Sequence, residues 1–183
     1  LFTAVFSGLE VIWDRQFGFL KETMVAPISR TEIMIGKTLG GATIAMIQGL
    51  IVLSLTYLLG FRIPGLANLA FGLVFMSLIA IFFTGLGLAI ASKMKDMQGF
   101  QLIMNFLIMP IFFLSGALFP LENLPPSIYF ISRIDPLTYG VDGLRGAIAG
   151  MNVFGIYNDL VVIGLLSVLV CMVGAFLFSK IEA

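Results

Sequence analysis

The sequence WDRQFGFLKETMVAPISRTEIMIGK, residues 13–37, is the most charged part of a very apolar chain. It holds seven of the twenty charged residues, although the chain has 183 residues in all. The whole chain is 60% hydrophobic and only 11% charged, whereas soluble domains are about 25% charged. Its mean hydropathy is +1.10. The composition therefore predicts an integral membrane protein in which this charged segment (residues 13–37) lies outside the lipid hydrocarbon.

Four runs of the sequence are long and apolar enough to cross a membrane, which takes about 20 residues in a helix. None of them contains a charged residue, and they occupy residues 38–59, 69–91, 100–119 and 160–179. Residues 1–12 have the composition of the end of another membrane helix. No initiator methionine or charged leader precedes them, so we expect a fragment that lacks the first helix. These patterns predict an all-α, polytopic helical bundle forming a single transmembrane domain.

The positions of the basic residues predict how the chain is oriented. One set of loops carries Arg15, Lys21, Arg30, Lys37, Lys93, Lys95 and Lys180, and the alternate loops carry Arg62, Arg133 and Arg145. Because basic loops stay on the cytoplasmic side, we expect the charged segment and the C-terminus to be cytoplasmic.

Within the charged segment, Phe17, Leu20, Met24 and Val25 fall at helical spacing. This spacing predicts a short amphipathic helix on the membrane surface. Pro27 should end it, since proline and the residue before it both disfavour a continuing helix. On these residues alone, the helix either anchors the topology or forms a docking lever for a cytoplasmic partner.

A second helix should begin just after the first. Ser29 and Glu32 have the spacing of a capping box, which predicts a helix start near Arg30. The Gly-Lys-Thr at 36–38 resembles the end of a phosphate-binding loop, but that pattern needs glycine where Thr31 stands. We therefore expect no ATP site here. Further along, small residues at four-residue spacing are either a helix-packing stripe or only the usual abundance of glycine in membrane helices. They are Gly41, Ala45 and Gly49.

Residues 120–159, the proline-rich segment, are too polar to span a membrane and too apolar for a free linker. Two short interfacial or re-entrant helices are predicted, at 127–134 and 136–149, with Asp135 as an N-cap before Pro136. Asp142 and Arg145 are spaced for an ion pair on the second helix. The segment either packs as an outer seal or forms an outer gate. The gate candidates are Pro120, Asp135, Pro136, Tyr139, Asp142 and Arg145.

Catalysis and metal binding are not expected. The chain has no histidine and one cysteine, Cys171, and its charges sum to zero. Without histidine, the commonest general base and metal ligand is missing, and a neutral chain gives no reason to expect nucleic acid. Ser115-Gly116 faintly resembles a serine-protease nucleophile, but Phe113 stands where that motif has glycine. We predict no catalytic, cofactor-binding or metal-binding residues.

Three stretches of the chain are together distinctive: FGFLKETMVAPISRTEIMIGKTLGG, PIFFLSGALFPLENLPP and ISRIDPLTYGVDGLRG. In their order, the chain resembles the permease subunits of type-2 ATP-binding-cassette (ABC) transporters, especially daunorubicin-resistance exporters and lipo-oligosaccharide exporters. The resemblance implies six membrane helices per subunit in the cytoplasmic membrane of a prokaryotic type of cell. This chain would then run from the end of the second helix to the sixth.

The same resemblance implies that residues 13–37 contain the coupling helix and elbow that rest on a separate ATPase subunit. ATP and magnesium would bind that subunit, and a second permease copy, identical or different, would complete the transporter within membrane lipid. The docking residues implied are Arg15, Phe17, Leu20, Lys21, Glu22, Met24, Pro27, Ser29, Arg30 and Glu32. The expected function is export of an amphiphilic drug, lipid or lipid-linked saccharide. A secondary transporter, a channel or a structural scaffold remains the alternative.

Overall fold

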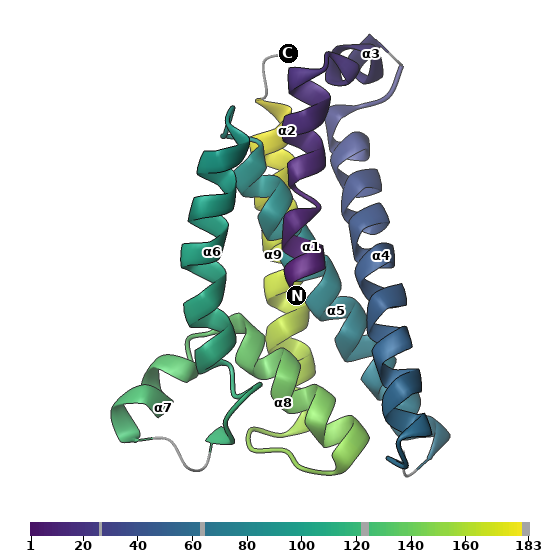
Figure 1. The fold of residues 1–183 in the computed structure, drawn as a ribbon, viewed down its shortest axis with the longest axis vertical. Helices are drawn as coiled ribbons and strands as arrows, with labels where there is room; N and C mark the ends of the chain where they lie inside the picture. Colours follow the sequence, from purple (N-terminus) through teal and green to yellow (C-terminus); the bar gives the residue numbers. More distant parts are fainter. Residues whose placement is uncertain (26, 63–64, 122–124, 181–183) are drawn as a thin grey trace. The chain divides into compact units, whose positions relative to one another are not determined.

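The computed structural model describes residues 1–25, 27–62, 65–121 and 125–180, without the side chains of Lys21 and Met24. The secondary-structure elements in these residues are α-helices (Figure 1). They are α1 (Phe2–Phe6), α2 (Leu9–Gln16), α3 (Phe19–Val25), α4 (Arg30–Leu58), α5 (Leu66–Ala91), α6 (Met97–Leu114), α7 (Pro126–Ser132), α8 (Pro136–Ala149) and α9 (Ile156–Ser179). The predicted all-α fold class is confirmed.

Four of these helices, α4, α5, α6 and α9, are long and apolar enough to cross a membrane. Each contains most of one sequence-predicted span. α4 starts at Arg30, well before residue 38, because the capping box at Ser29 begins the helix outside the apolar run. α6 continues through Pro110 and ends at Leu114, just before the left-handed Gly116 (φ 79°). The chain is thus built as a multi-pass membrane protein.

The helices form two compact units. Unit 1 contains Leu1–Ala45, Ala80–Phe106 and Ser167–Ala183, and unit 2 contains Met46–Ile79 and Leu107–Leu166. Because the four long helices each contribute residues to both units, each unit is itself a small helical bundle.

In unit 1, α1 packs against α5 with the two backbones almost touching. A Cβ atom added at Gly8 would lie 2.6 Å from the carbonyl oxygen of Gly87. Gly41 of α4 is equally confined, since its Cβ would lie 2.6 Å from the Ser7 hydroxyl. The rings of Phe6 and Phe100 meet edge to face, with centroids 6.5 Å apart. Small residues therefore let three helices approach closely, as is usual between membrane helices.

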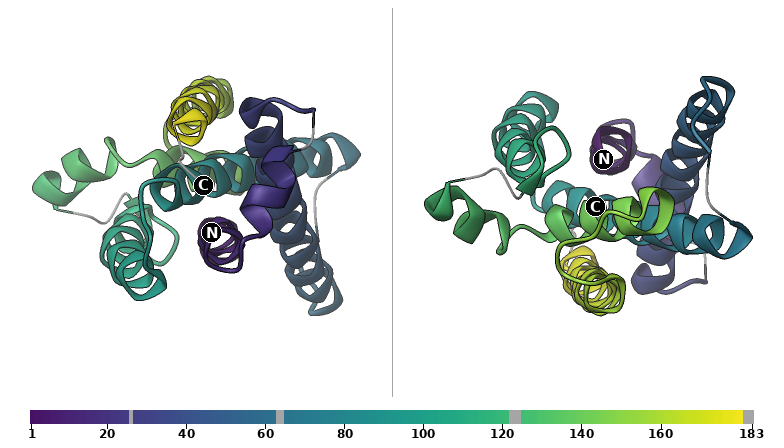
Figure 2. Two further views of the ribbon diagram at one scale, coloured as in Figure 1. Left: turned by 90° about the horizontal axis from the view of Figure 1, so that it is seen from above. Right: turned by 90° about the horizontal axis from the view of Figure 1, so that it is seen from below.

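In unit 2, α8 packs on α5 through small residues of both helices. Gly140 faces Ile79, and Gly143 lies against the ring of Phe75, while Gly72 faces Ile148. Figure 2 shows α7 and α8 following one another as two short helices with a bend between them. α8 has the bounds expected from the sequence, and α7 ends two residues earlier than the predicted 134. Gly49 of α4 is also in this unit, against the methyl group of Met76.

Candidate coupling surface and outer segment

The amphipathic helix predicted in the charged segment is interrupted after its first residues. α2 ends at Gln16 and α3 starts at Phe19, with Gly18 at φ +84° between them. A positive φ breaks the α-helical hydrogen-bond ladder, and glycine adopts it without steric cost. The single amphipathic helix predicted through Phe17 and Leu20 is therefore wrong at this glycine.

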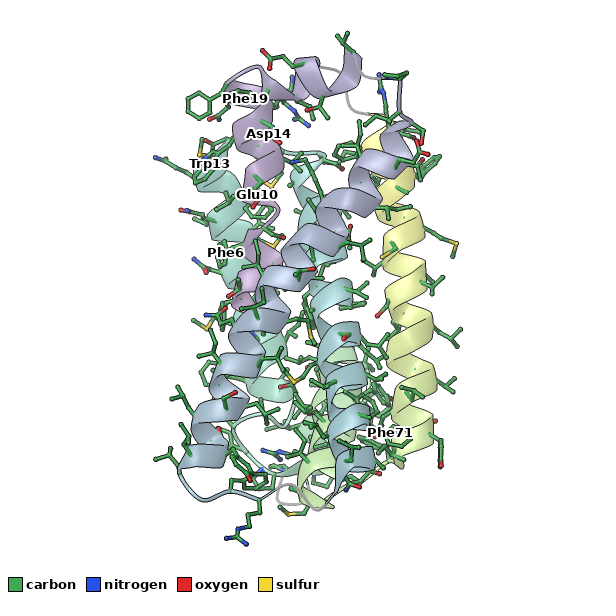
Figure 3. All side chains as sticks on the ribbon, turned by 90° about the vertical axis from the view of Figure 1, so that its right-hand side faces the viewer. Phe6, Glu10, Trp13, Asp14, Phe19 and Phe71 are labelled. Carbon is green, nitrogen blue, oxygen red and sulfur yellow. The ribbon has the colours of Figure 1, made fainter. Side chains whose placement is uncertain are left out.

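The break separates the apolar side chains into an exposed and a buried group. Leu20 is 1% exposed, so it belongs to the core of unit 1 and not to a docking face. Phe17 and Phe19 are 71% and 57% exposed, and Val25 is also exposed. Figure 3 shows Phe19 projecting outward at the start of α3. We call Phe17, Phe19 and Val25 the apolar edge; the side chains of the predicted docking residues Lys21 and Met24 lie outside the described part, and Glu22 is exposed.

Arg15 points toward the turn between α5 and α6. Its guanidinium donates to the carbonyl oxygens of Met94 (2.8 Å) and Ser92 (3.0 Å). The neighbouring Gln16 donates to the carbonyl oxygen of Lys95 at 3.1 Å. Burial lowers the pKa of the Arg15 guanidinium, but arginine stays protonated at neutral pH. This predicted docking residue is thus engaged within unit 1.

Two further contacts fix the charged segment to other helices of unit 1. Asp14 of α2 forms an ion pair with Lys37 of α4 at 2.5 Å. Arg30 at the start of α4 donates to the carbonyl oxygen of Ser179 at the end of α9, at 2.8 Å. Trp13, Asp14 and Phe19 are visible along this part of the chain in Figure 3. The segment is therefore held on several helix ends rather than lying free.

The predicted capping box at the start of α4 is confirmed. The backbone N–H of Ser29 donates to the Glu32 carboxylate at 2.7 Å, and the Glu32 N–H donates to the Ser29 hydroxyl at 3.2 Å. Pro27 lies in the connection between α3 and α4, as the elbow interpretation requires, while Ala26 lies outside the described residues. Both Ser29 and Glu32 are exposed, so they shape the elbow locally.

In the proline-rich segment, the predicted start of α8 is also confirmed. Asp135 accepts from the Leu137 N–H at 2.9 Å, and Pro136 occupies the first helical turn. The Tyr139 hydroxyl donates to the Arg133 carbonyl oxygen at 2.7 Å, which fixes the bend between α7 and α8. Burial is the main cause that raises the pKa of the Asp135 carboxyl to about 7.

The predicted ion pair between Asp142 and Arg145 is not what the structure shows. The Asp142 carboxylate accepts from the backbone N–H groups of Val153 and Phe154, both at 2.9 Å. Arg145 donates to the carbonyl oxygen of Ala117 at 3.2 Å instead. The reason is geometric. The loop after α8 brings two backbone N–H groups to the Asp142 carboxylate, and hydrogen bonds to a charged carboxylate are strong. The carboxylate is therefore bound by the loop and not by Arg145.

Asn152 is a functional candidate that the sequence reasoning missed. Its side-chain amide donates to the Asp159 carboxylate at 2.8 Å and to the Asp142 carbonyl oxygen at 3.4 Å, while its oxygen accepts from the Gly155 N–H. One residue therefore joins the loop to α8 and α9. An asparagine between Gly150 and Gly155 is a turn signal that could have pointed to it.

A pocket of about 320 Å³ lies within unit 2, and three predicted gate residues line it together: Pro120, Asp142 and Arg145. Asp135, Pro136 and Tyr139 are not in its lining. The rest of the wall is mostly apolar. In the described residues, no three His, Cys, Asp or Glu side chains gather into a metal-binding group.

Comparison with known proteins places these features in a family. The family model for ABC-2 type transporters matches residues 1–149. A putative transport permease, ycf38, of Pyropia yezoensis is 30% identical over 154 residues, which are 81% of this chain and 52% of that protein. The inner membrane transport permease YadH of Escherichia coli K12 is 27% identical, over 86% of this chain and 58% of that protein.

A third relative carries a more specific name. The probable multidrug ABC transporter permease YbhR of Escherichia coli K12 is 28% identical over 138 residues, which are 75% of this chain and 37% of YbhR. The chain thus spans about half the length of the curated relatives it matches. Since the family match covers most of the chain, and four helices in its described part are long and apolar enough to cross a membrane, the chain belongs to the ABC-2 type transporter family of membrane permeases.

Proposed function

We propose that this chain is part of a permease subunit of an ATP-driven exporter, and that a separate ATPase subunit docks on its apolar edge. ATP and magnesium bind to the ATPase, and the permease contributes binding and motion rather than chemistry. A second permease copy completes the transporter in the cytoplasmic membrane. The charged segment and the C-terminus then face the cytoplasm.

The observation that carries the proposal is the exposure of Phe17, Phe19 and Val25 on a segment that is otherwise firmly held. These side chains are 71%, 57% and 85% exposed, while Leu20 beside them is buried. Aromatic side chains on a fixed support are typical anchors of protein interfaces. An edge that only anchored the chain in lipid would not need the contacts that Asp14, Arg15, Gln16 and Arg30 make to other parts of unit 1.

The proposed cargo is an amphiphile, meaning a drug, a lipid or a lipid-linked saccharide. Two features support this class. Between Lys37 and Ser179, the described spans carry no Asp, Glu, Lys or Arg except Asp159, near the start of α9, so an ion-coupled path has few charged groups to use. The pocket in unit 2 combines the side chains of Arg145 and Asp142 with mostly apolar walls, a surface suited to amphiphilic molecules.

The test is co-purification of the full-length protein from its own membrane in mild detergent. A stoichiometric soluble subunit with a phosphate-binding loop is expected to accompany it. Phe17→Asp and Phe19→Asp should reduce that subunit at least about tenfold, because a charge would replace a buried interface anchor. Phe130→Asp is the matched control, since Phe130 of α7 is 67% exposed but lies in the proline-rich segment.

Two results would count against the proposal. One is a wild-type protein that repeatedly purifies intact without such a subunit, which would favour the channel or scaffold alternative. The other is an equal loss of the subunit in Phe130→Asp and Phe19→Asp, which would show that the apolar edge is not the docking site.

A further inference from the structure

Two side chains at the C-terminal end of α2 bind backbone carbonyl oxygens of the turn between α5 and α6 (residues 92–96). Ser92 and Met94 each offer a carbonyl oxygen to the Arg15 guanidinium, and Lys95 offers one to Gln16. The last carbonyls of a helix have no partner inside it, and a cation near them also interacts favourably with the helix dipole. Arg15 therefore binds the turn directly after the last residue of α5, Ala91, where its charge also interacts favourably with the helix dipole.

The contact extends to the beginning of α6. The indole N–H of Trp13 donates to the sulfur of Met97, the first residue of α6. Within unit 1, the last turn of α2 thus contacts the end of one membrane-crossing helix and the start of the next. Since Arg15 and Gln16 bind backbone oxygens, these contacts hold the main chain of the turn and do not depend on the rotamers of its side chains.

This contact lies immediately beside the apolar edge. Phe17 follows Gln16, and Gly18 (φ +84°) then turns the chain into α3 with Phe19 exposed at its start. The buried Leu20 fixes α3 to unit 1. A force applied to Phe17 or Phe19 would therefore reach Arg15 through a single bend of the backbone.

We propose that Arg15 is a positioning residue that carries the displacement of the apolar edge into α5 and α6. This inference rests on the proposed docking of the ATPase subunit. A displacement of the apolar edge would follow the chain through Pro27 into α4, and the Arg15 contact adds a second route. The first route follows the chain from α3 into α4. The Arg15 contact instead joins α2 directly to the turn between α5 and α6, which comes much later in the sequence.

The first test compares variants of Arg15 in the complete transporter. Arg15→Gln should keep the ATPase subunit bound, while the amount of cargo moved per ATP hydrolysed falls. The loss should be roughly tenfold, because one charge-assisted hydrogen bond of ordinary strength corresponds to about that factor. Arg15→Lys retains the charge but cannot bind both carbonyls in a fork, so it should recover only part of the coupling.

Lys93→Gln is the matched control for charge. Lys93 lies in the same turn and is exposed, so this variant removes a positive charge without touching the Arg15 contact. It should leave transport per ATP unchanged. A change in Lys93→Gln as large as in Arg15→Gln would assign the effect to the charge of the turn and overturn the proposal.

A distance measurement tests the proposal separately from protein stability, because a merely destabilised variant would not show a distance that depends on ATP. Spin labels at Glu22→Cys in α3 and Lys95→Cys in the turn would be placed on exposed positions, in a Cys171→Ser background that removes the chain's only cysteine. With Arg15 present, the label distance should be the same without nucleotide and with ATP, because the two elements move together. In Arg15→Gln, the distance should change or broaden on ATP binding.

The outcomes separate this inference from the proposed function. A wild-type protein without an ATPase subunit would refute the docking itself. An Arg15→Gln transporter that keeps its ATPase, its transport per ATP and its label distance would refute only the role of Arg15. Should Arg15→Gln fail to assemble, Gln16→Ala removes the adjacent contact to Lys95 and carries the same expectations in weaker form.

Discussion

The carbonyl oxygen of Val5 in α1 lies where a side chain on Gly87 of α5 would begin. The contact is reciprocal, because a Cβ atom on Gly8 would lie 2.6 Å from the carbonyl oxygen of Gly87. A flexible side chain could rotate away from such an atom, but a helix backbone cannot. The packing of α1 on α5 therefore depends on glycine at two positions that are far apart in the sequence.

We predict that Gly87→Ala destabilises the protein by about 1–3 kcal/mol or more, because the added methyl group overpacks a rigid contact. Thermal unfolding of the detergent-solubilised protein measures the effect. Gly36→Ala is the control, since no heavy atom lies within 4 Å of a Cβ there and alanine favours the helix. Equal unfolding temperatures for the two variants would refute the close approach of α1 and α5.

A second prediction concerns the two sides of the charged segment. Leu20→Ala should lower stability by about 2–5 kcal/mol, as usual for a large buried residue, because Leu20 is 1% exposed. Phe17→Ala should change stability little, since that side chain is 71% exposed. The same unfolding measurement compares them. If both variants behaved alike, the single amphipathic helix predicted from spacing would be favoured over the break at Gly18.

The parts of the site that the sequence predicted are those decided by neighbouring residues. The capping box at Ser29 and Glu32 and the Asp135-Pro136 helix start depend on contacts within three residues, so their spacing is sufficient. The split of the charged segment was missed because periodicity counts apolar positions and ignores the backbone angle that Gly18 adopts.

Contacts between distant parts of the chain could not be predicted in this way. The binding of Arg15 to Ser92 and Met94 joins the end of α2 to the turn after α5, and no spacing in the sequence indicates this contact. The partners of Asp142 illustrate the same limit. Helical spacing pointed to Arg145, whereas the carboxylate is bound by a loop whose path the sequence does not give.

A third prediction follows from that loop. Asp142→Ala should expose the amides of Val153 and Phe154 to hydrogen exchange, because it removes their acceptor. Each lost charge-assisted hydrogen bond corresponds to about 1.5–3 kcal/mol of local stability. Arg145→Gln is the control and should leave both amides protected, since Arg145 contacts Ala117. If the Val153 and Phe154 amides exchanged equally fast in both variants, the ion pair between Asp142 and Arg145 predicted from the sequence would be favoured instead.

A final prediction concerns Asp135, whose burial raises the pKa of its carboxyl from 3.8 to about 7. The folded state therefore binds a proton more tightly than the unfolded state between these values. The stability that this group contributes is complete below about pH 4 and is lost as the pH rises toward 7. The Asp135 carboxyl should accordingly lower the unfolding temperature of the wild-type protein at about pH 8 relative to about pH 5.

Two substitutions separate the charge of Asp135 from its role as a helix cap. Asp135→Asn keeps an acceptor for the Leu137 N–H and has no charge to bury, so it should raise the unfolding temperature at about pH 8 and change it little at about pH 5. Asp135→Ala loses the cap and should cost about 1 kcal/mol at the lower pH. The expected rise in unfolding temperature at about pH 8 comes from removing a buried charge. If Asp135→Asn showed no such rise, the surroundings of Asp135 would stabilise the charged carboxylate, against the prediction.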